Sequence, residues 1–214
     1  MPTDPRPQAL VWDMDGTLID SATVVPDAFI ATVAALGVPG YDRDEVVALY
    51  SLGAPPAMLG RMLDRPATVE DVDAYHRELA DRAAAVRAYP GITETLTALR
   101  PRLPMAVFTG ASTRAAEILL AAAGLDGFFD VVVGGDQVAH PKPDPAGILR
   151  ACELLGVDPA TTAYIGDAPT DLLAAERSGA RPLAAAWGHL HDETAAAERA
   201  IRAPGDLLPL LLTD

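Results

Sequence analysis

The chain contains a single cysteine, Cys152, and a single lysine, Lys142, among its 214 residues. One cysteine cannot form an internal disulfide, so nothing in the sequence calls for an oxidising compartment. No apolar run approaches the roughly 20 residues of a membrane-spanning helix. The first residues, Met1–Pro7, contain no apolar stretch of the signal-peptide type. We therefore expect a cytoplasmic protein with no membrane partner.

Positive charge is also scarce in this chain. There are 16 basic residues against 30 acidic residues, which gives a net charge of −14. A protein that binds nucleic acid or an anionic membrane without specificity needs a basic surface. The charge balance therefore argues against both kinds of partner. It leaves open whether the protein is a monomer or a homodimer.

The residues that are abundant suit an ordinary folded protein. Half of the chain is apolar and 21% of it is charged, which excludes disorder and low-complexity repeats. A length of 214 residues fits one domain, or one domain with a small insert.

Short apolar runs alternate with helical segments over most of the chain. The expected strands cover residues 8–13, 105–109, 129–133, 161–166 and 182–186. The expected helices of this part cover residues 112–123, 145–155, 169–178 and about 193–201. Alternation of this kind predicts an α/β fold with a parallel sheet and helices on both faces.

The segment from Ser21 to Asp81 shows little strand signal. Helical stretches are expected there at about 22–36, 42–51, 55–63 and 69–87. This all-helical segment interrupts the alternation directly after the first strand, so we interpret it as an insert at the carboxyl end of that strand. Ligands bind at this edge of open α/β sheets, and a helical insert there is placed to act as a lid.

Two carboxylates lie where the first expected strand ends. Asp13 and Asp15 are separated by one residue, and Gly16 follows them. In such a pair, one carboxylate can attack a substrate or bind a metal while the other transfers protons. Gly16 permits the sharp turn that brings backbone close to a ligand.

Two further polar clusters follow later strands. Asp167 and Asp171 are one helical turn apart, so both can face the same opening. Thr109 and Gly110 precede a helix that begins near Ser112. A hydroxyl beside free N–H groups at a helix N-terminus can bind an anion.

Lys142 lies between Pro141 and Pro143, which stiffen the loop and fix the direction of the ammonium group. A compact ammonium can contact a phosphoryl oxygen and a carboxylate in one tight site. The carboxylates of Asp13, Asp15, Asp167 and Asp171 would repel one another without a cation. Oxygen ligands with water suit Mg²⁺, so we expect a magnesium site.

In order along the chain, DMDGTLIDS (13–21), FTG (108–110), Lys142 and GDAPTD (166–171) resemble the four motifs of the haloacid dehalogenase-like hydrolase superfamily. The helical insert resembles the small α-helical cap of the phosphoglycolate phosphatase-like subfamily, and AAWGH (185–189) resembles its loop after the last core strand. The resemblance implies a Rossmann-like catalytic core formed by residues 1–19 and 88–214. It implies an α-helical cap formed by residues 20–87.

The resemblance also implies roles for these residues in a Mg²⁺-dependent phosphatase, a phosphoric monoester hydrolase. Asp13 would form an aspartyl-phosphate, Asp15 would act as acid and base, and Lys142 would steady the transferring charge. Thr109 and the Gly110 N–H would bind the phosphoryl oxygens. The metal would be held by the Asp13 carboxylate, the Asp15 backbone carbonyl, Asp167 and, in support, Asp171.

The substrate expected from the resemblance is a small phosphorylated metabolite, either phosphoglycolate-like or a sugar phosphate. Gly110 and Ala111 stand where close phosphoglycolate phosphatases often have Asn and Lys, and Ala168 replaces a frequent Ser or Thr. These departures remove side-chain donors near the substrate. The alternatives are a β-phosphoglucomutase-type phosphomutase and a catalytically silent regulatory module on the same fold.

The helical insert offers several residues that could contact the leaving group, but spacing alone does not choose among them. They are Tyr50, Ser51, Gly53, Arg61 and Arg65.

Overall fold

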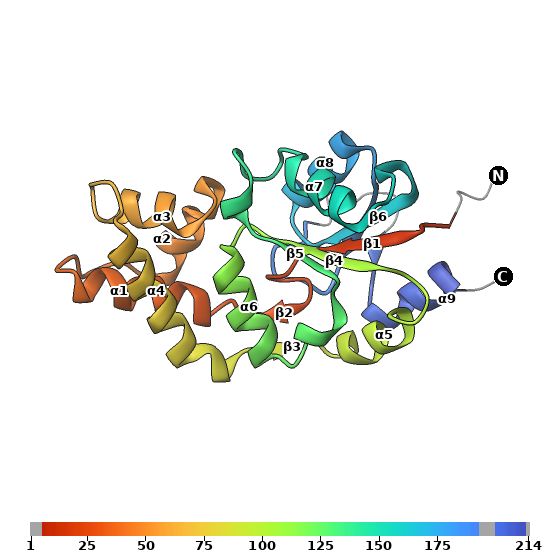
Figure 1. Ribbon diagram of the computed structural model, residues 1–214. Helices are drawn as coiled ribbons and strands as arrows, with labels where there is room; N and C mark the ends of the chain where they lie inside the picture. The colour runs from red at the N-terminus through yellow and green to blue at the C-terminus, as the bar shows by residue number, and fades with distance from the viewer. Residues whose placement is uncertain (1–5, 193–199, 213–214) are drawn as a thin grey trace.

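The computed structural model describes residues 6–192 and 200–212. Its centre is a six-stranded parallel sheet (Figure 1) with the strand order β5-β4-β1-β6-β7-β8. The strands are β1 (Ala9–Trp12), β4 (Met105–Phe108), β5 (Val131–Val133), β6 (Thr162–Gly166), β7 (Arg181–Ala185) and β8 (Ala200–Ile201). Every residue of β1, β4 and β6 is buried, as expected for central strands covered on both sides.

Helices cover both faces of the sheet (Figure 1). One face carries α7 (Ala146–Leu155) and α8 (Pro169–Ser178), and the other carries α5 (Ile92–Leu99), α6 (Thr113–Ala122) and α9 (Leu207–Leu212). Residues of β1 alternate between the two layers: Val11 belongs to the cluster on the α7 side, and Leu10 and Trp12 belong to the opposite one. The predicted α/β class is confirmed. None of the helices in the described part of the chain is long and apolar enough to cross a membrane.

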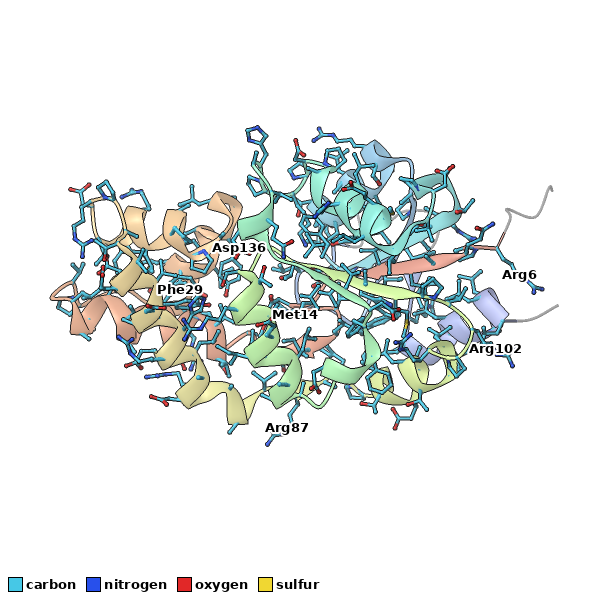
Figure 2. All side chains as sticks on the ribbon, in the orientation of Figure 1. Arg6, Met14, Phe29, Arg87, Arg102 and Asp136 are labelled. Atoms are coloured by element: carbon cyan, nitrogen blue, oxygen red, sulfur yellow. The ribbon has the colours of Figure 1, made fainter. Side chains whose placement is uncertain are left out.

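The insert forms a group of helices at one end of the molecule (Figure 1). Its helices are α1 (Val24–Ala35), α2 (Arg43–Ala48), α3 (Pro55–Met62) and α4 (Val69–Arg82), with a short 3₁₀ turn at Tyr50–Leu52. Asp42 and Thr68 begin α2 and α4 with capping boxes, in which each side chain accepts from the backbone three residues on. Figure 2 shows Phe29 among these helices. The group's apolar interior is continuous with one layer of the core.

The two chain crossings between sheet and insert lie side by side. β2 (Ile19–Asp20) pairs antiparallel with β3 (Arg87–Ala88), so that Ile19 is opposite Ala88. The boundaries predicted for a core of 1–19 and 88–214 and a cap of 20–87 fall inside this pair. The division into two domains stays a prediction. We call residues 20–87 the cap from here on.

The last helix expected from the sequence is not found in the part of it that the structure describes. Of the helix expected at about 193–201, residues 193–199 lie outside the described part of the chain. Ala200 and Ile201 form strand β8, which pairs in parallel with β7, so the helix prediction is wrong for these two residues. Pairing with the edge of the sheet overrides local preference, because it satisfies backbone groups along β7 and buries Ile201.

Candidate active site

Three neighbouring strands deliver the predicted polar residues to one place. Asp13 follows β1, Thr109 follows β4 and Asp167 follows β6. Since β4, β1 and β6 are adjacent and parallel, their carboxyl ends meet at one edge of the sheet. The three side chains are almost fully buried there. The structure therefore brings together residues that are about 150 positions apart in the chain.

Lys142 joins two of the carboxylates. Its Nζ donates to Asp13 Oδ1 at 2.5 Å and to Asp171 Oδ1 at 2.6 Å. The side chains of all three residues are 13% exposed or less. Tyr164 adds a polar contact, with its hydroxyl 3.3 Å from Nζ. The ammonium thus links the end of β1 with the first turn of α8.

Burial and charge act in opposite directions on this group of residues. Burial raises the pKa of Asp13 well above its ordinary value, and Asp171 and Asp167 add to that rise while Lys142 opposes it. Burial works to lower the pKa of Lys142, but Asp13 and Asp171 outweigh it and hold that pKa well above the ordinary value. Lys142 therefore stays charged, but one ammonium can balance only one of the carboxylates around it, so ionisation of the others calls for a further cation.

Carboxylate oxygens of Asp13, Asp167 and Asp171 lie within 4.8 Å of one another. Buried oxygen donors in such a cluster fit a small, hard divalent cation. Asp167 is held in place by the Leu190 N–H, which donates to Oδ2 at 2.9 Å, and by the Thr17 hydroxyl, which donates to Oδ1 at 3.3 Å. The residues present thus fit the predicted metal. Binding by the Asp15 backbone carbonyl stays a prediction.

Asp15 lies beside Asp13 but makes different contacts. Its Oδ1 accepts from the Ser21 hydroxyl at 2.5 Å, and its Oδ2 accepts from the Thr109 hydroxyl at 3.4 Å. Burial raises the pKa of Asp15, and the hydrogen bond from Ser21 opposes that rise. A carboxyl group with a raised pKa beside a second carboxylate can deliver and take up a proton.

The loop after β4 forms another wall of the site. Thr109 Oγ1 accepts from the Ala111 N–H at 3.1 Å, and Gly110 lines the adjoining cavity. Ser112 caps α6 by accepting from the Ala115 N–H, and its hydroxyl is also 2.7 Å from His76 Nε2 of the cap. The Ser112 hydroxyl is thereby occupied, which leaves Thr109 as the hydroxyl of this loop that faces the carboxylates.

A cavity of about 460 Å³ lies between the core and the cap. On the core side its walls include Asp13, Asp15, Thr109, Lys142 and Asp167. On the cap side its walls include Val25, Phe29, Tyr50, Met58 and Tyr75.

The five residues of the cap that the sequence offered as candidates separate into two groups. Tyr50, Ser51 and Gly53 line the cavity. Arg61 and Arg65 do not: Arg61 is exposed, and Arg65 is paired with Asp71.

The loop after β7, which contains the AAWGH segment, also supports the site. Trp187 Nε1 donates to the Thr17 carbonyl oxygen at 2.9 Å, which ties this loop to the one after β1. His189 Nδ1 lies 3.2 Å from the Tyr89 hydroxyl, and the charge of His189 acts to lower the pKa of Asp15. Trp187 therefore positions backbone rather than facing the cavity.

Two glycines leave room for the side chain of Asp167. A Cβ on Gly16, where φ is +84°, would lie 2.3 Å from Asp167 Oδ2. A Cβ on Gly188 would lie 2.2 Å from Asp167 Cβ and 2.4 Å from the Gly16 carbonyl oxygen. Real atoms do not approach so closely, so only glycine fits either position. The sequence predicts a turn at Gly16 but indicates no role for Gly188, because no residue near Gly188 in the sequence shows that Asp167 packs against it.

Gly188→Ala is expected to weaken the predicted metal binding by displacing Asp167. Because one of the obstructing atoms is backbone, the strain cannot be relieved by a side chain alone. We expect the Mg²⁺ concentration for half-maximal activity to rise about 10- to 100-fold, measured by metal titration. Gly127→Ala is the matched control, since its added Cβ meets nothing within 4 Å. Equal titration curves for the two variants would contradict this role of Gly188.

A sequence model of the haloacid dehalogenase-like hydrolases matches residues 7–179. The chain belongs to this family. The match spans the four motifs from Asp13 to Asp171.

Individual relatives agree with this assignment. The chain is 38% identical over 198 residues to the probable phosphatase IndB of Dickeya dadantii, covering 88% of this chain and 86% of that protein. It is 31% identical over 206 residues to a phosphoglycolate phosphatase of Aquifex aeolicus, covering 95% and 96%. The solved structure of CbbY from Rhodobacter sphaeroides in complex with phosphate is 28% identical, with a TM-score of 0.81 and coverage of 94% and 96%. The chain is accordingly a phosphatase, a phosphoric monoester hydrolase of this family.

Proposed function

We propose that this phosphatase is Mg²⁺-dependent and hydrolyses a small phosphorylated metabolite through an aspartyl-phosphate on Asp13. The observation that carries the proposal is the contact of Lys142 with both Asp13 and Asp171, beside Asp167 and at the wall of the cavity. A carboxylate can attack phosphorus efficiently only when it is held in position, and the contact with Lys142 holds Asp13. A cytoplasmic location and a monomer or homodimer stay predictions.

The reaction divides into two displacements at phosphorus. In the first, a carboxylate oxygen of Asp13 bonds to phosphorus, the ester P–O bond breaks, and Asp15 gives its proton to the departing alcohol oxygen. In the second, Asp15 takes a proton from water while the water oxygen bonds to phosphorus. The bond between phosphorus and Asp13 then breaks, which releases phosphate and restores both carboxyl groups.

Other residues would stabilise the charge that develops at the phosphoryl oxygens. Lys142 supplies a buried positive charge, and the Thr109 hydroxyl and Gly110 N–H supply hydrogen bonds. A divalent cation held by Asp13, Asp167 and Asp171 would offset the remaining negative charge and orient the phosphoryl group. Together these groups would reverse the sign of the electrostatic field locally, so an anionic substrate is compatible with a net charge of −14.

The cap would exclude bulk water during the reaction. Cap and core make contact around the cavity: His76 meets Ser112, Arg114 of α6 pairs with Asp73 of α4 at 2.6 Å, and Gly53 lies against Pro141. These contacts describe a closed arrangement. The exposed Arg114–Asp73 pair contributes little to this arrangement on its own.

Neither alternative is favoured by the cavity. A phosphomutase must hold a bisphosphate, and the described cap residues that line the cavity include no lysine, arginine or histidine for a second phosphate. A silent scaffold would gain nothing from burying Asp13, Asp167 and Asp171 together, because burial of like charges is unfavourable.

Metal removal tests the proposal. Phosphate release from 4-nitrophenyl phosphate is expected to fall at least about 100-fold in EDTA and to return with Mg²⁺, because three buried carboxylates would otherwise repel the phosphate dianion. The measurement is a phosphate assay on the same sample before chelation, after chelation and after metal is restored. Full activity in EDTA would exclude the metal-dependent mechanism.

A further inference from the structure

The cap side of the cavity is apolar and aromatic. Val25, Phe29 and Met58 contribute hydrocarbon and aromatic surface, and Tyr50 and Tyr75 contribute phenol rings. Phe29 of α1 and Tyr75 of α4 stack with ring centroids 4.1 Å apart and planes 25° from parallel. Together these residues, here called the cap wall, face the site where the phosphoryl group would be transferred.

The positively charged residues of the cap do not contribute to the walls of the cavity. The cap contains no lysine, and none of its arginines lines the cavity. Arg43 forms a bidentate pair with Asp27 through two hydrogen bonds of 2.7 Å. Arg65 forms a bidentate pair with Asp71 through hydrogen bonds of 2.5 and 3.0 Å. The remaining ones are Arg61 and Arg77, which are exposed, Arg82, which pairs with Glu78, and Arg87, which donates to backbone carbonyls.

Lys142 cannot serve a second anion either. Its ammonium already contacts Asp13 and Asp171 and lies where the transferring phosphoryl group would need it. Among the described residues that line the cavity, no other lysine, arginine or histidine is present. A leaving group with its own carboxylate or phosphate would therefore be buried with no positively charged partner, which is unfavourable.

The polar side-chain groups on the cap side of the cavity are the phenol hydroxyls of Tyr50 and Tyr75 and the hydroxyl of Ser51. Burial raises the pKa of Tyr50 and of Tyr75, and the charge of Asp15 adds to both rises. Both phenols thus remain protonated and lie within the field of Asp15, the proposed proton donor to the leaving oxygen. They can hydrogen-bond an uncharged polar atom near the ester bond, but they cannot neutralise an anion.

We propose that the substrate is a phosphate monoester whose leaving group is uncharged and presents a flat or apolar body to the cap wall. This inference rests on the proposed phosphatase reaction and narrows it. Phosphoglycolate, which carries a carboxylate, and sugar bisphosphates are then poor substrates. A cavity of about 460 Å³ is within the range of sites that hold drug-sized ligands, so a leaving group with a ring fits the available space.

Two esters that differ by one charge test the inference on the unmodified protein. Benzyl phosphate and 4-carboxybenzyl phosphate share the same body and ester bond. We expect kcat/KM for benzyl phosphate to exceed that for the carboxylated ester, and that for 2-phosphoglycolate, by about 100-fold or more, because a site rejects a group that it must bury unpaired. A preference below about 10-fold, or a preference for either carboxylated ester, would overturn the inference while the phosphatase proposal stands. Absence of phosphate release from every ester would overturn both.

A positive charge placed on the cap wall should reduce the discrimination against the carboxylated ester. Met58→Arg puts a guanidinium on the α3 side of the cavity, and we expect it to raise the ratio of kcat/KM for the carboxylated ester to that for benzyl phosphate by about 10-fold or more. Leu36→Arg is the matched control, because Leu36 is exposed at the end of α1 and does not line the cavity. Equal ratios for the two variants would overturn the assignment of the cap wall. Val25→Arg repeats the test from α1 if Met58→Arg does not fold.

Discussion

Asp13→Asn is expected to abolish turnover, with kcat reduced by about 10⁴-fold or more. The amide has almost the same shape as the carboxylate but is a poor nucleophile, so the first displacement at phosphorus cannot proceed. It also removes one of the carboxylates clustered for metal binding. Phosphate release in the steady state and in a single turnover measures the loss.

Folding should survive this substitution. Asp13 is 4% exposed and its pKa is raised chiefly by burial, so a neutral side chain removes a buried charge. Lys142 keeps its bond to Asp171. Asp126→Asn is the matched control at an exposed position far along the chain, and we expect it to retain full activity. Residual kcat above about a hundredth of the original value would contradict nucleophilic attack by Asp13.

The position of the active site follows from features that can be recognised locally. Asp13, Thr109 and Asp167 each come directly after an apolar run, and a run of this kind predicts a buried strand without any knowledge of its neighbours. Parallel strands then place their carboxyl ends on one edge. The order of the strands within the sheet was not needed for this step, which explains why the motif residues could be predicted together.

Short pairings between distant segments could not be predicted. β2, β3 and β8 contain two residues each, which is too few for an alternating pattern to be visible. Ala200 and Ile201 follow a stretch rich in alanine and glutamate, a composition that favours helix. Only their contact with β7 makes them a strand, and such a contact is absent from any local window of the sequence.

On the cap side of the site, the contacts of individual side chains also could not be predicted from the sequence. The spacing in the sequence makes Tyr50 and Arg65 equal candidates for contacting the leaving group. The packing of the cap distinguishes them, because only Tyr50 lines the cavity. Arg65 pairs with Asp71, the residue that also closes the capping box of Thr68. Several acidic residues near Arg65 in the sequence could have been its partner. The choice depends on where α4 begins in three dimensions, so the absence of positive charge from the cap wall could be found only in the structure.

Lys142→Met is expected to lower both the activity and the stability of the protein, because the same ammonium group contributes to catalysis and to the buried ion pairs. Methionine keeps the aliphatic part of the side chain and removes the charge that steadies Asp13 and the phosphoryl group, so kcat should fall by about 10³-fold. Removing one partner from a buried ion pair costs about 3–5 kcal/mol of the free energy of unfolding. Lys142→Arg should not restore activity, since a planar guanidinium cannot replace an ammonium held between two carboxylates at 2.5 and 2.6 Å.

Metal dependence of stability separates this role from simple loss of packing. Without Lys142, a divalent cation would be the main group that offsets the charges of Asp13, Asp167 and Asp171, so Mg²⁺ should raise Tm more in Lys142→Met than in the unmodified protein. Arg150→Met is the control: it removes a cation whose partner Glu153 is 69% exposed, and such a pair contributes about 1 kcal/mol or less. Thermal unfolding with and without Mg²⁺ measures the difference. An equal Mg²⁺ shift in all three proteins would mean that Lys142 does not balance the charge of the metal-binding carboxylates, and retained kcat in Lys142→Met would exclude it from the reaction.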